Sequence, residues 1–275
     1  MLYPNRFLKM PVLGTTVALA LLSVSLRITA AETAPTYAPL KPNEFMTSWL
    51  VLKPIPVSAS TESEPDNQSQ KKAFEQDLLA EQGGESTVRP HAGMKVKVAG
   101  QELEWTIANS SKDFIDLESG SKNSDHSLGY AWAEIQMPEK AKGILGIGSD
   151  DAVKVWLNGK KVHEKWVARA AQPDDDLVPV EFQRGTNQIL LKIQNMKGEW
   201  GFFCRLMGPE AQAEKLIATV RRGDTDELKR DLDAGLDINS RSRADVTAWQ
   251  AARLDSSRSL SERQHARPAR CAPAG

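Results

Sequence analysis

The chain has 275 residues and carries 35 Lys and Arg against 36 Asp and Glu, which gives a formal net charge of −1. This even balance excludes the bulk electrostatic attraction that draws basic proteins to nucleic acid or to anionic membranes. The two cysteines, Cys204 and Cys271, fall in an apolar strand pattern and in a polar tail, so we expect no disulfide between them. Stability must then come from a packed apolar core, for which the chain is long enough.

The first 31 residues have the features of a signal peptide. Arg6 and Lys9 supply positive charge, the mainly apolar stretch 12–26 follows, and Thr29-Ala30-Ala31 offers small residues to a signal peptidase. The apolar stretch is shorter than the about 20 residues that a membrane-spanning helix needs. An uncleaved anchor is the alternative interpretation. Both predict an exported protein, periplasmic or secreted, and cleavage would leave no membrane span.

The segment after the leader predicts little regular structure. Residues 32–44 lack periodicity and predict a linker. Residues 49–52 form a short apolar run that predicts a strand, ended by Pro54 and Pro56 because proline has no N–H to donate. A helix is predicted over Gln70–Glu81, ended by the two glycines that follow.

From Gly93 to Leu206, apolar and polar residues alternate with a period of two, and turn residues separate the runs. Many short strands without intervening helices favour an antiparallel β-sandwich over a parallel α/β sheet. We therefore predict one β-sandwich domain over residues 45–209. Its main strands are expected at Met94–Val98, Leu103–Ile107, Tyr130–Met137, Ile144–Ile147, Val153–Leu157, Val162–Trp166, Val178–Phe182, Gln188–Gln194 and Phe202–Leu206.

The clearest local signal is Asn158-Gly159 between two β-forming runs. It predicts a two-residue type I′ hairpin, in which both central residues need positive φ. Directly opposed residues share one face of a sheet. Trp156 would then lie on the face opposite to Val155, either as an exposed platform beside lysine or beneath a covering loop. The turn sets four predicted pairs, Leu157–Lys160, Trp156–Lys161, Val155–Val162 and Lys154–His163.

After Gly208 the pattern becomes that of helices. Residues 211–222 predict one helix, and Asp224 caps a second helix that ends at Gly235. Periodicity is lost in residues 254–275, which predict a disordered tail.

Two stretches within this strand-rich region resemble a known family. Gly148-Ser-Asp-Asp-Ala-Val-Lys-Val-Trp-Leu-Asn-Gly-Lys-Lys-Val-His163 and Arg184-Gly-Thr-Asn-Gln-Ile-Leu-Leu-Lys-Ile193 resemble the galactose-binding-like jelly roll. That fold includes non-catalytic domains of many secreted bacterial glycoside hydrolases. The resemblance implies a binding module with carbohydrate as the ligand class, although the same sandwich also hosts protein binding and structural support.

The C-terminal helices resemble a second family. Residues 216–239 look like one ankyrin repeat, and 246–252 look like the start of another, with Asp245 and Ala248 departing from the usual glycine and proline. About three stacked repeats are normally needed for stability. Residues 210–253 are therefore predicted to be a partial ankyrin segment that packs on the sandwich or frays, and that would contact a protein partner. The change of pattern after Arg253 favours the hypothesis of a chain truncated or frame-shifted from a longer protein.

No motif supports catalysis. The sequence has no Gly-x-Ser-x-Gly elbow, and Ser69-Gln-Lys-Lys72 lacks the companion motifs of penicillin-binding enzymes. Ser124-Asp125-His126 are neighbours in sequence, whereas a catalytic triad needs neighbours in space. The four histidines are scattered without zinc-ligand spacing. We expect a protein that is not an enzyme.

The hairpin and the loop after it hold the candidate ligand-binding residues. A flat apolar ring, a guanidinium and carboxylate or amide acceptors suit sugar rings, which have an apolar face and a rim of hydroxyls. In the alternative interpretation Trp166 is a core residue and Arg169 pairs with the aspartates. The candidates are Trp156, Trp166, Arg169, Gln172 and Asp174.

Acidic residues beside them are candidate calcium ligands. Asp150, Asp151, Asp175 and Asp176 supply the oxygen atoms that Ca²⁺ prefers, and structural calcium is common in the family that the sandwich resembles. Solvated loop carboxylates are the alternative, and no other cofactor is expected.

Three functions stay open at this point. The first is an exported binding module directed to carbohydrate or to a cell surface. The second is a structural adaptor without a small ligand, and the third is the N-terminal fragment of a longer secreted hydrolase.

Overall fold

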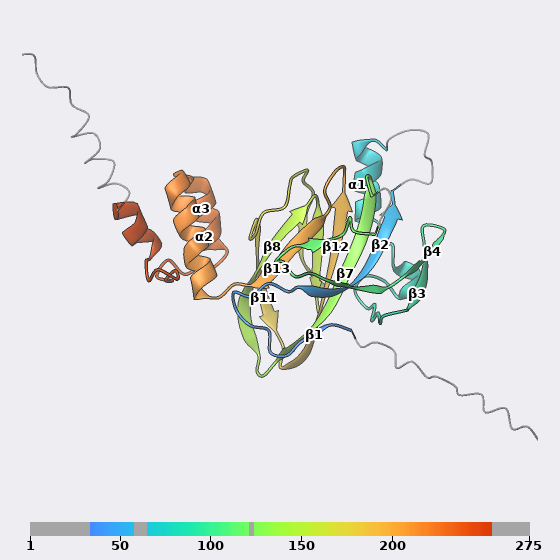
Figure 1. Ribbon diagram of the computed structural model, residues 1–275, viewed down its shortest axis with the longest axis horizontal. Coiled ribbons are helices and arrows are strands. Elements are labelled where there is room, and N and C mark those ends of the chain that lie inside the picture. Colours follow the sequence, from blue (N-terminus) through green and yellow to red (C-terminus); the bar gives the residue numbers. More distant parts are fainter. Residues whose placement is uncertain (1–33, 58–64, 121–123, 255–275) are drawn as a thin grey trace, which may run out of the picture. The chain divides into compact units, whose positions relative to one another are not determined.

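The computed structural model describes residues 34–57, 65–120 and 124–254, which all belong to one compact unit (Figure 1). The expected leader over residues 1–31 and nearly all of the expected tail, from residue 255 on, lie outside the described residues. Within the described ranges no helix is both long enough and apolar enough to cross a bilayer.

Two large sheets form the body of the protein. The first has the spatial order β10-β9-β12-β7-β2-β5, with β1 paired to β7, and the second has the order β11-β8-β13-β6. All pairs except β1–β7 are antiparallel, which confirms the prediction of a mainly antiparallel β fold. The first sheet comprises β1 (Thr36–Tyr37), β2 (Ser48–Pro56), β5 (Thr106–Asn109), β7 (Ser127–Met137), β9 (Val153–Leu157), β10 (Lys160–Lys165) and β12 (Gly185–Asn195). The second comprises β6 (Ile115–Asp116), β8 (Ala141–Asp150), β11 (Asp176–Phe182) and β13 (Gly201–Leu206).

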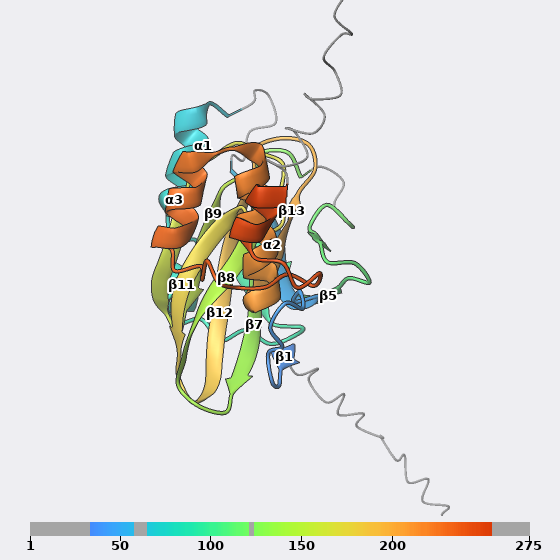
Figure 2. The same ribbon diagram turned by 90° about the vertical axis from the view of Figure 1, so that its left-hand side faces the viewer.

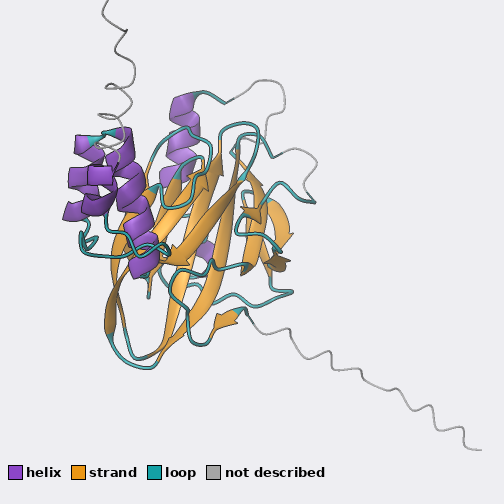
Figure 3. Ribbon diagram, turned by 60° about the vertical axis from the view of Figure 1, so that its left-hand side comes forward, coloured by secondary structure: helices purple, strands orange, loops and turns teal. Residues whose placement is uncertain are grey.

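The two sheets share a buried apolar core. Val155 and Leu191 of the first sheet and Ile147 and Val178 of the second belong to it, as the alternation along each strand requires. We call this pair of sheets the two-sheet body (Figure 3).

A second core covers the other face of the first sheet. It lies under helix α1 (Asn67–Glu75), the short 3₁₀ helix Ala80–Gln82 and the hairpin of β3 (Lys95–Val98) and β4 (Gln101–Glu104). Phe74 of α1 and Val96 of β3 meet Trp132 and Trp156 of the sheet in this core. The first sheet is therefore buried on both faces.

Two helices pack together after the last strand. α2 (Pro209–Arg222) and α3 (Thr225–Asp233) lie side by side in both views (Figures 1 and 2), and residues 248–254 are again helical. Leu216 and Ile217 of α2 share an apolar cluster with Ile144 of β8, so this segment packs on the two-sheet body. The Asn43 side chain caps α2, since its Oδ1 accepts hydrogen bonds from Gly208 N at 2.8 Å and Ala211 N at 3.1 Å.

Several boundaries differ from the sequence prediction. Strand β2 continues to Pro56, because its register with β7 shifts between Leu52 and Ile55 and so accommodates Pro54. Helix α1 ends at Glu75 rather than Glu81. The segment 32–44, predicted to be a linker, contains the short strand Thr36–Tyr37, which pairs with β7. The short strand β6, which pairs with β13, was not predicted.

The Asn158-Gly159 hairpin is confirmed, with φ of 52° and 78° at the two turn residues. The first two predicted pairs, Leu157–Lys160 and Trp156–Lys161, are also observed. A register shift after Lys161 then places His163 opposite Val155 and Glu164 opposite Lys154, so the predicted Val155–Val162 and Lys154–His163 pairs are wrong. Such a bulge adds one residue to β10 and redirects Val162, which is half-buried at the margin of the core.

Candidate functional site

The structure separates the two predicted tryptophans from the predicted polar residues. Trp156 is 6% exposed in the core beneath α1. Trp166 is half-buried, with its ring centroid 5.2 Å from that of Phe74 of α1. Trp156 is therefore covered, as one interpretation allowed, but by the core under helix α1 rather than by a loop. Trp166 packs against Phe74, as in the interpretation that made it a packing residue.

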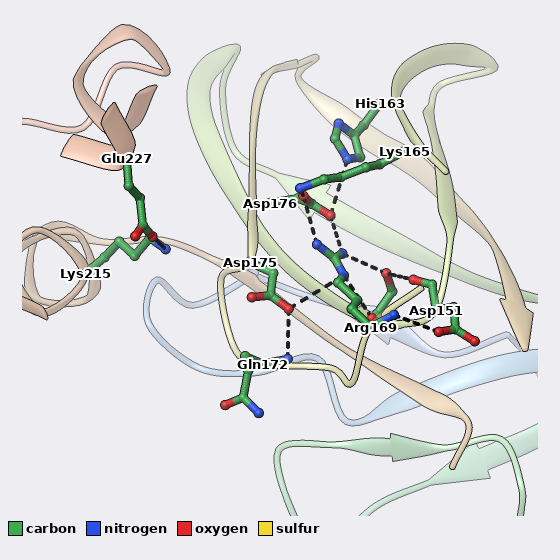
Figure 4. A network of polar contacts seen from close by, with 10 residues as sticks. Asp151, His163, Lys165, Arg169, Gln172, Asp175, Asp176, Lys215 and Glu227 are labelled. Carbon is green, nitrogen blue, oxygen red and sulfur yellow. Dashed lines mark hydrogen bonds and ion pairs between the residues drawn. The ribbon is translucent and has the colours of Figure 1, made fainter. Parts of the chain in front are cut away.

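Arg169 lies at the centre of a polar network (Figure 4). Its Nε donates to the Ser149 carbonyl at 3.1 Å and its Nη1 donates to Asp176 Oδ1 at 3.2 Å. Lys165 Nζ reaches the same carboxylate oxygen at 2.7 Å, and His163 Nε2 lies 3.4 Å from Asp176 Oδ2. Burial alone would raise the pKa of Asp176, but contacts with His163, Arg169 and Lys165 outweigh it and hold this pKa well below its usual range.

The other predicted residues take part in neighbouring contacts. Asp174 pairs with the guanidinium of Arg205, whose Nε lies 3.0 Å from Oδ1. Gln172 uses its backbone N–H to donate to Asp175 at 2.9 Å, while its side chain points away from the network (Figure 4). Arg169 and the aspartates of this loop thus form hydrogen bonds and ion pairs mainly within the protein.

The four proposed calcium ligands do not form an oxygen cage. Asp151 accepts from the backbone N–H of Arg169 at 2.8 Å and of Met196 at 2.7 Å, and Asp176 is surrounded by cations. Across the described part of the chain, no group of three or more His, Cys, Asp or Glu side chains is arranged to hold a metal ion. The residues present therefore do not fit the calcium site that the sequence suggested.

Asp150 gives a pH-dependent prediction. Burial, followed by the negative charges of Asp151 and Glu199, raises the pKa of Asp150 to about 6 in the folded protein. Its unfolded value is about 3.9, so between about pH 4 and pH 6 the folded state binds more protons and stability falls as pH rises. Asp150→Asn should remove this fall and raise stability at pH 7. Urea unfolding of the wild type and of Asp150→Asn at pH 4, 5, 6 and 7 tests this prediction. A difference in the free energy of unfolding between the two proteins that stays the same across this pH range would contradict it.

A cleft lies elsewhere, where the last strands of the two sheets meet. β5 ends the first sheet and β6 ends the second, and the cleft of about 850 Å³ opens between them. We call it the edge cleft. Its walls combine the apolar residues Ile107, Ala108 and Phe114 with the hydroxyl and amide groups of Thr106, Asn109 and Ser110, and the buried Trp200 closes its inner side.

Polar groups of the edge cleft fall into two kinds. The first kind fixes the backbone of the segment after β6. Lys53 Nζ donates to the Leu117 carbonyl at 2.6 Å, and Asp116 Oδ1 accepts from Glu118 N at 2.8 Å. Burial lowers the pKa of Lys53, an effect that the charges of Asp116 and Glu118 oppose.

Other groups are available to a ligand. Asn109 Oδ1 accepts from the Ser48 hydroxyl at 2.6 Å, which orients the amide and leaves its NH₂ group without a partner among the described residues. The side chains of Thr106 and Glu199 are also exposed there and make no hydrogen bond within the described ranges. The cleft therefore presents a donor, a hydroxyl and a carboxylate beside apolar walls.

Sequence reasoning missed this site. The residues come from β2, β5, β6 and the segment before β13, which are distant along the chain and meet only in the folded protein. The polar run 109–113 between two strands is the single local signal, and it reads as an ordinary loop.

Comparisons with known proteins give no family. No protein-family model matches the sequence, and no curated protein matches it. The folded chain is similar to part of a β-glucosidase from Kluyveromyces marxianus, with a TM-score of 0.32 and 9% identity over 46% of this chain and 18% of that chain. It is also similar to an anti-sigma factor domain-containing protein from Clostridium clariflavum, with a TM-score of 0.29 and 14% identity over 37% and 35% of the two chains. It is similar as well to a GH31 α-xylosidase from Xanthomonas citri, with a TM-score of 0.28 and 13% identity over 37% of this chain and 12% of that chain. Each match spans well under two thirds of the other protein.

Proposed function

We propose that this chain is an exported, non-catalytic binding module that takes a saccharide in the edge cleft. The carrying observation is the lining of that cleft, in which apolar side chains alternate with an oriented amide, a hydroxyl and a carboxylate. A sugar ring needs both an apolar surface and directed hydrogen bonds to its hydroxyls. The volume of about 850 Å³ lies within the range of small-ligand sites, about 300–1,000 Å³.

A binding role fits the carboxylates better than a hydrolytic one. Glycoside hydrolysis uses two carboxyl groups facing each other across the sugar, one as acid and one as base or nucleophile. Asp116 accepts from the backbone N–H groups of Glu118 and Ser119 and so fixes a turn. Glu118, which also lines the cleft, accepts from the Ser124 hydroxyl. Glu199 is therefore the exposed carboxylate of the lining that makes no hydrogen bond within the described ranges, and no second free carboxylate accompanies it there.

The finer features of the proposal rest on the sequence. The leader over residues 1–31 supports export, the motifs at 148–163 and 184–193 support a galactose-binding-like β-sandwich, and 210–253 resemble a partial ankyrin segment. In the alternative, the chain is a structural adaptor that uses this helical segment. The large apolar side chains exposed in the described ranges, Leu232, Ile238, Trp249 and Leu254, all lie in or next to it, and this favours the alternative.

Removing the free amide of the edge cleft tests the proposal. We expect the wild-type protein to bind one or more polysaccharides on a glycan array, and Asn109→Ala to bind about fivefold more weakly, since one directed hydrogen bond contributes about 1 kcal/mol. Isothermal titration with the best array ligand measures the change. Gln101→Ala, which removes an exposed amide on β4 outside the cleft, is the matched control.

Two outcomes would contradict the saccharide proposal. One is an array without any bound glycan although the protein melts cooperatively, which would favour the adaptor. The other is equal affinity of Asn109→Ala and the wild type for the same glycan. The Ser48–Asn109 hydrogen bond lies at the surface, so we expect Asn109→Ala to fold like the wild type. Thermal melting of both variants checks that any weaker binding does not come from unfolding.

A further inference from the structure

The opposite edge of the two-sheet body carries a second groove. β10 ends the first sheet at this side and β11 ends the second, and the two strands contact each other. The groove between them has a volume of about 530 Å³ and shares no residue with the edge cleft. Its apolar wall includes Leu157, Val162 and Pro179.

The bulge in β10 helps to form this wall. An unbulged hairpin would pair Val162 with Val155 and turn it into the core, whereas the observed register pairs His163 with Val155. Val162 is left half-buried at the margin of the core, where it lines the groove. The extra residue thus supplies apolar surface next to lysines.

The charge of the groove is positive and only partly compensated. Lys142 and Lys160 line it, and neither forms an ion pair within the described residues. Glu181 is the one acidic residue of the lining, and it pairs with Lys140. The low pKa of Glu181, caused first by its hydrogen bond to Lys140, also reflects the nearby charges of Lys142 and Lys160. Two ammonium groups are therefore left to face an anionic ligand.

The edges of the two strands do not suit an added peptide strand. Pro179 of β11 has no N–H to donate to a neighbouring strand, and the bulge interrupts the regular edge of β10. A small ring fits better, because the groove offers an apolar wall, the exposed amide of Gln183 and positive charge at its rim.

We infer that this groove is a second binding site, specific for a saccharide that carries a carboxylate, such as a uronate residue. Lys142 and Lys160 would bind the carboxylate, and the sugar ring would lie against Leu157, Val162 and Pro179. The site is separate from the edge cleft, so it stands or falls independently of the proposed function.

Isothermal titration with a galacturonate pentasaccharide, at low and at moderate salt, tests this inference. We expect measurable binding that weakens as salt rises, and a loss of at least tenfold in the double variant Lys142→Gln/Lys160→Gln. The control Lys71→Gln/Lys72→Gln removes the same charge from α1, outside the groove, and should bind like the wild type. Asn109→Ala should also bind this probe normally, which separates the two sites.

Four outcomes would overturn the inference. They are absence of binding to the pentasaccharide, unchanged affinity of the groove variant, an equal loss in the control variant, and equal or tighter binding of pentaglutamate or of a sulfated pentasaccharide. The first two would exclude the groove as a site. An equal loss in the control variant would show that binding depends on the net charge of the protein rather than on the groove. Equal or tighter binding of pentaglutamate or of a sulfated pentasaccharide would show that the groove is not specific for a carboxylated sugar. Thermal melting of the variants checks that each is folded.

Discussion

Replacing Lys192 by methionine should lower the free energy of unfolding by about 3–5 kcal/mol, the usual cost of removing one partner from a buried ion pair. The Lys192 side chain is fully buried between β12 and the α1 segment. Its Nζ lies 3.0 Å from Glu85 Oε1, and the Tyr130 hydroxyl donates to the same oxygen at 2.6 Å. Without Lys192 the carboxylate of Glu85 would stay buried, and Tyr130 would be its remaining side-chain hydrogen-bond partner among the described residues.

The double variant Lys192→Met/Glu85→Gln is the control for this prediction. Because it removes both charges, it should recover much of the lost stability, and a double-mutant cycle from guanidinium unfolding gives the coupling. A loss below about 1 kcal/mol in Lys192→Met would show that Glu85 is readily solvated and would contradict the prediction.

The same lysine should also affect stability at alkaline pH. Burial lowers the pKa of Lys192 to about 8, although the charge of Glu85 opposes the shift. The unfolded value is about 10.4, so between about pH 8 and pH 10 the unfolded state binds more protons and this group makes stability rise with pH. Lys192→Met should lack this contribution when the two proteins are unfolded at pH 7, 8, 9 and 10.

Trp156→Ala should have the second large effect, a loss of about 3–5 kcal/mol, as expected for a tryptophan deleted from a core. Trp156 sits opposite Leu190 of β12 and belongs to the apolar cluster that includes Phe74 of α1. Trp166→Ala should cost less, about 1–2 kcal/mol, because Trp166 is only half-buried against Phe74.

Trp249→Ala is the comparison for both tryptophan variants. Its side chain is 61% exposed, so we expect a change within about 0.5 kcal/mol. Urea unfolding gives all three values. Near-wild-type stability of Trp156→Ala together with weaker saccharide binding would contradict the packing described here and would restore the platform that the sequence allowed.

The hairpin shows how far sequence reasoning reaches in this protein. Asn158-Gly159 predicts the turn and the first two pairs, because both turn residues need positive φ and the chain is locally constrained. The bulge after Lys161 depends on how β10 meets β9 and the rest of the sheet, and no local residue type marks it. The prediction therefore fails within three residues of the turn.

The candidate site was harder to predict than the strands. Alternation shows that Trp156 lies on the face opposite to Val155, but it does not show that α1 covers that face. The edge cleft depends on which strands end each sheet, and the spatial orders β10-β9-β12-β7-β2-β5 and β11-β8-β13-β6 are not those of the sequence. Arg169 was predicted to bind a ligand and Asp176 to bind calcium, whereas the structure pairs them with each other, which is the alternative interpretation that the sequence left open.

The cap on α2 bears on how this chain can be divided. Asn43 precedes the first long strand, yet its side chain holds the backbone at Gly208 and Ala211, more than 160 residues later. A version trimmed to begin at Ser48 would therefore release the start of a helix at the far end of the polypeptide. Residues 34–47 therefore contact both the strands and the start of α2, and a fragment that lacks them would lose the cap on this helix.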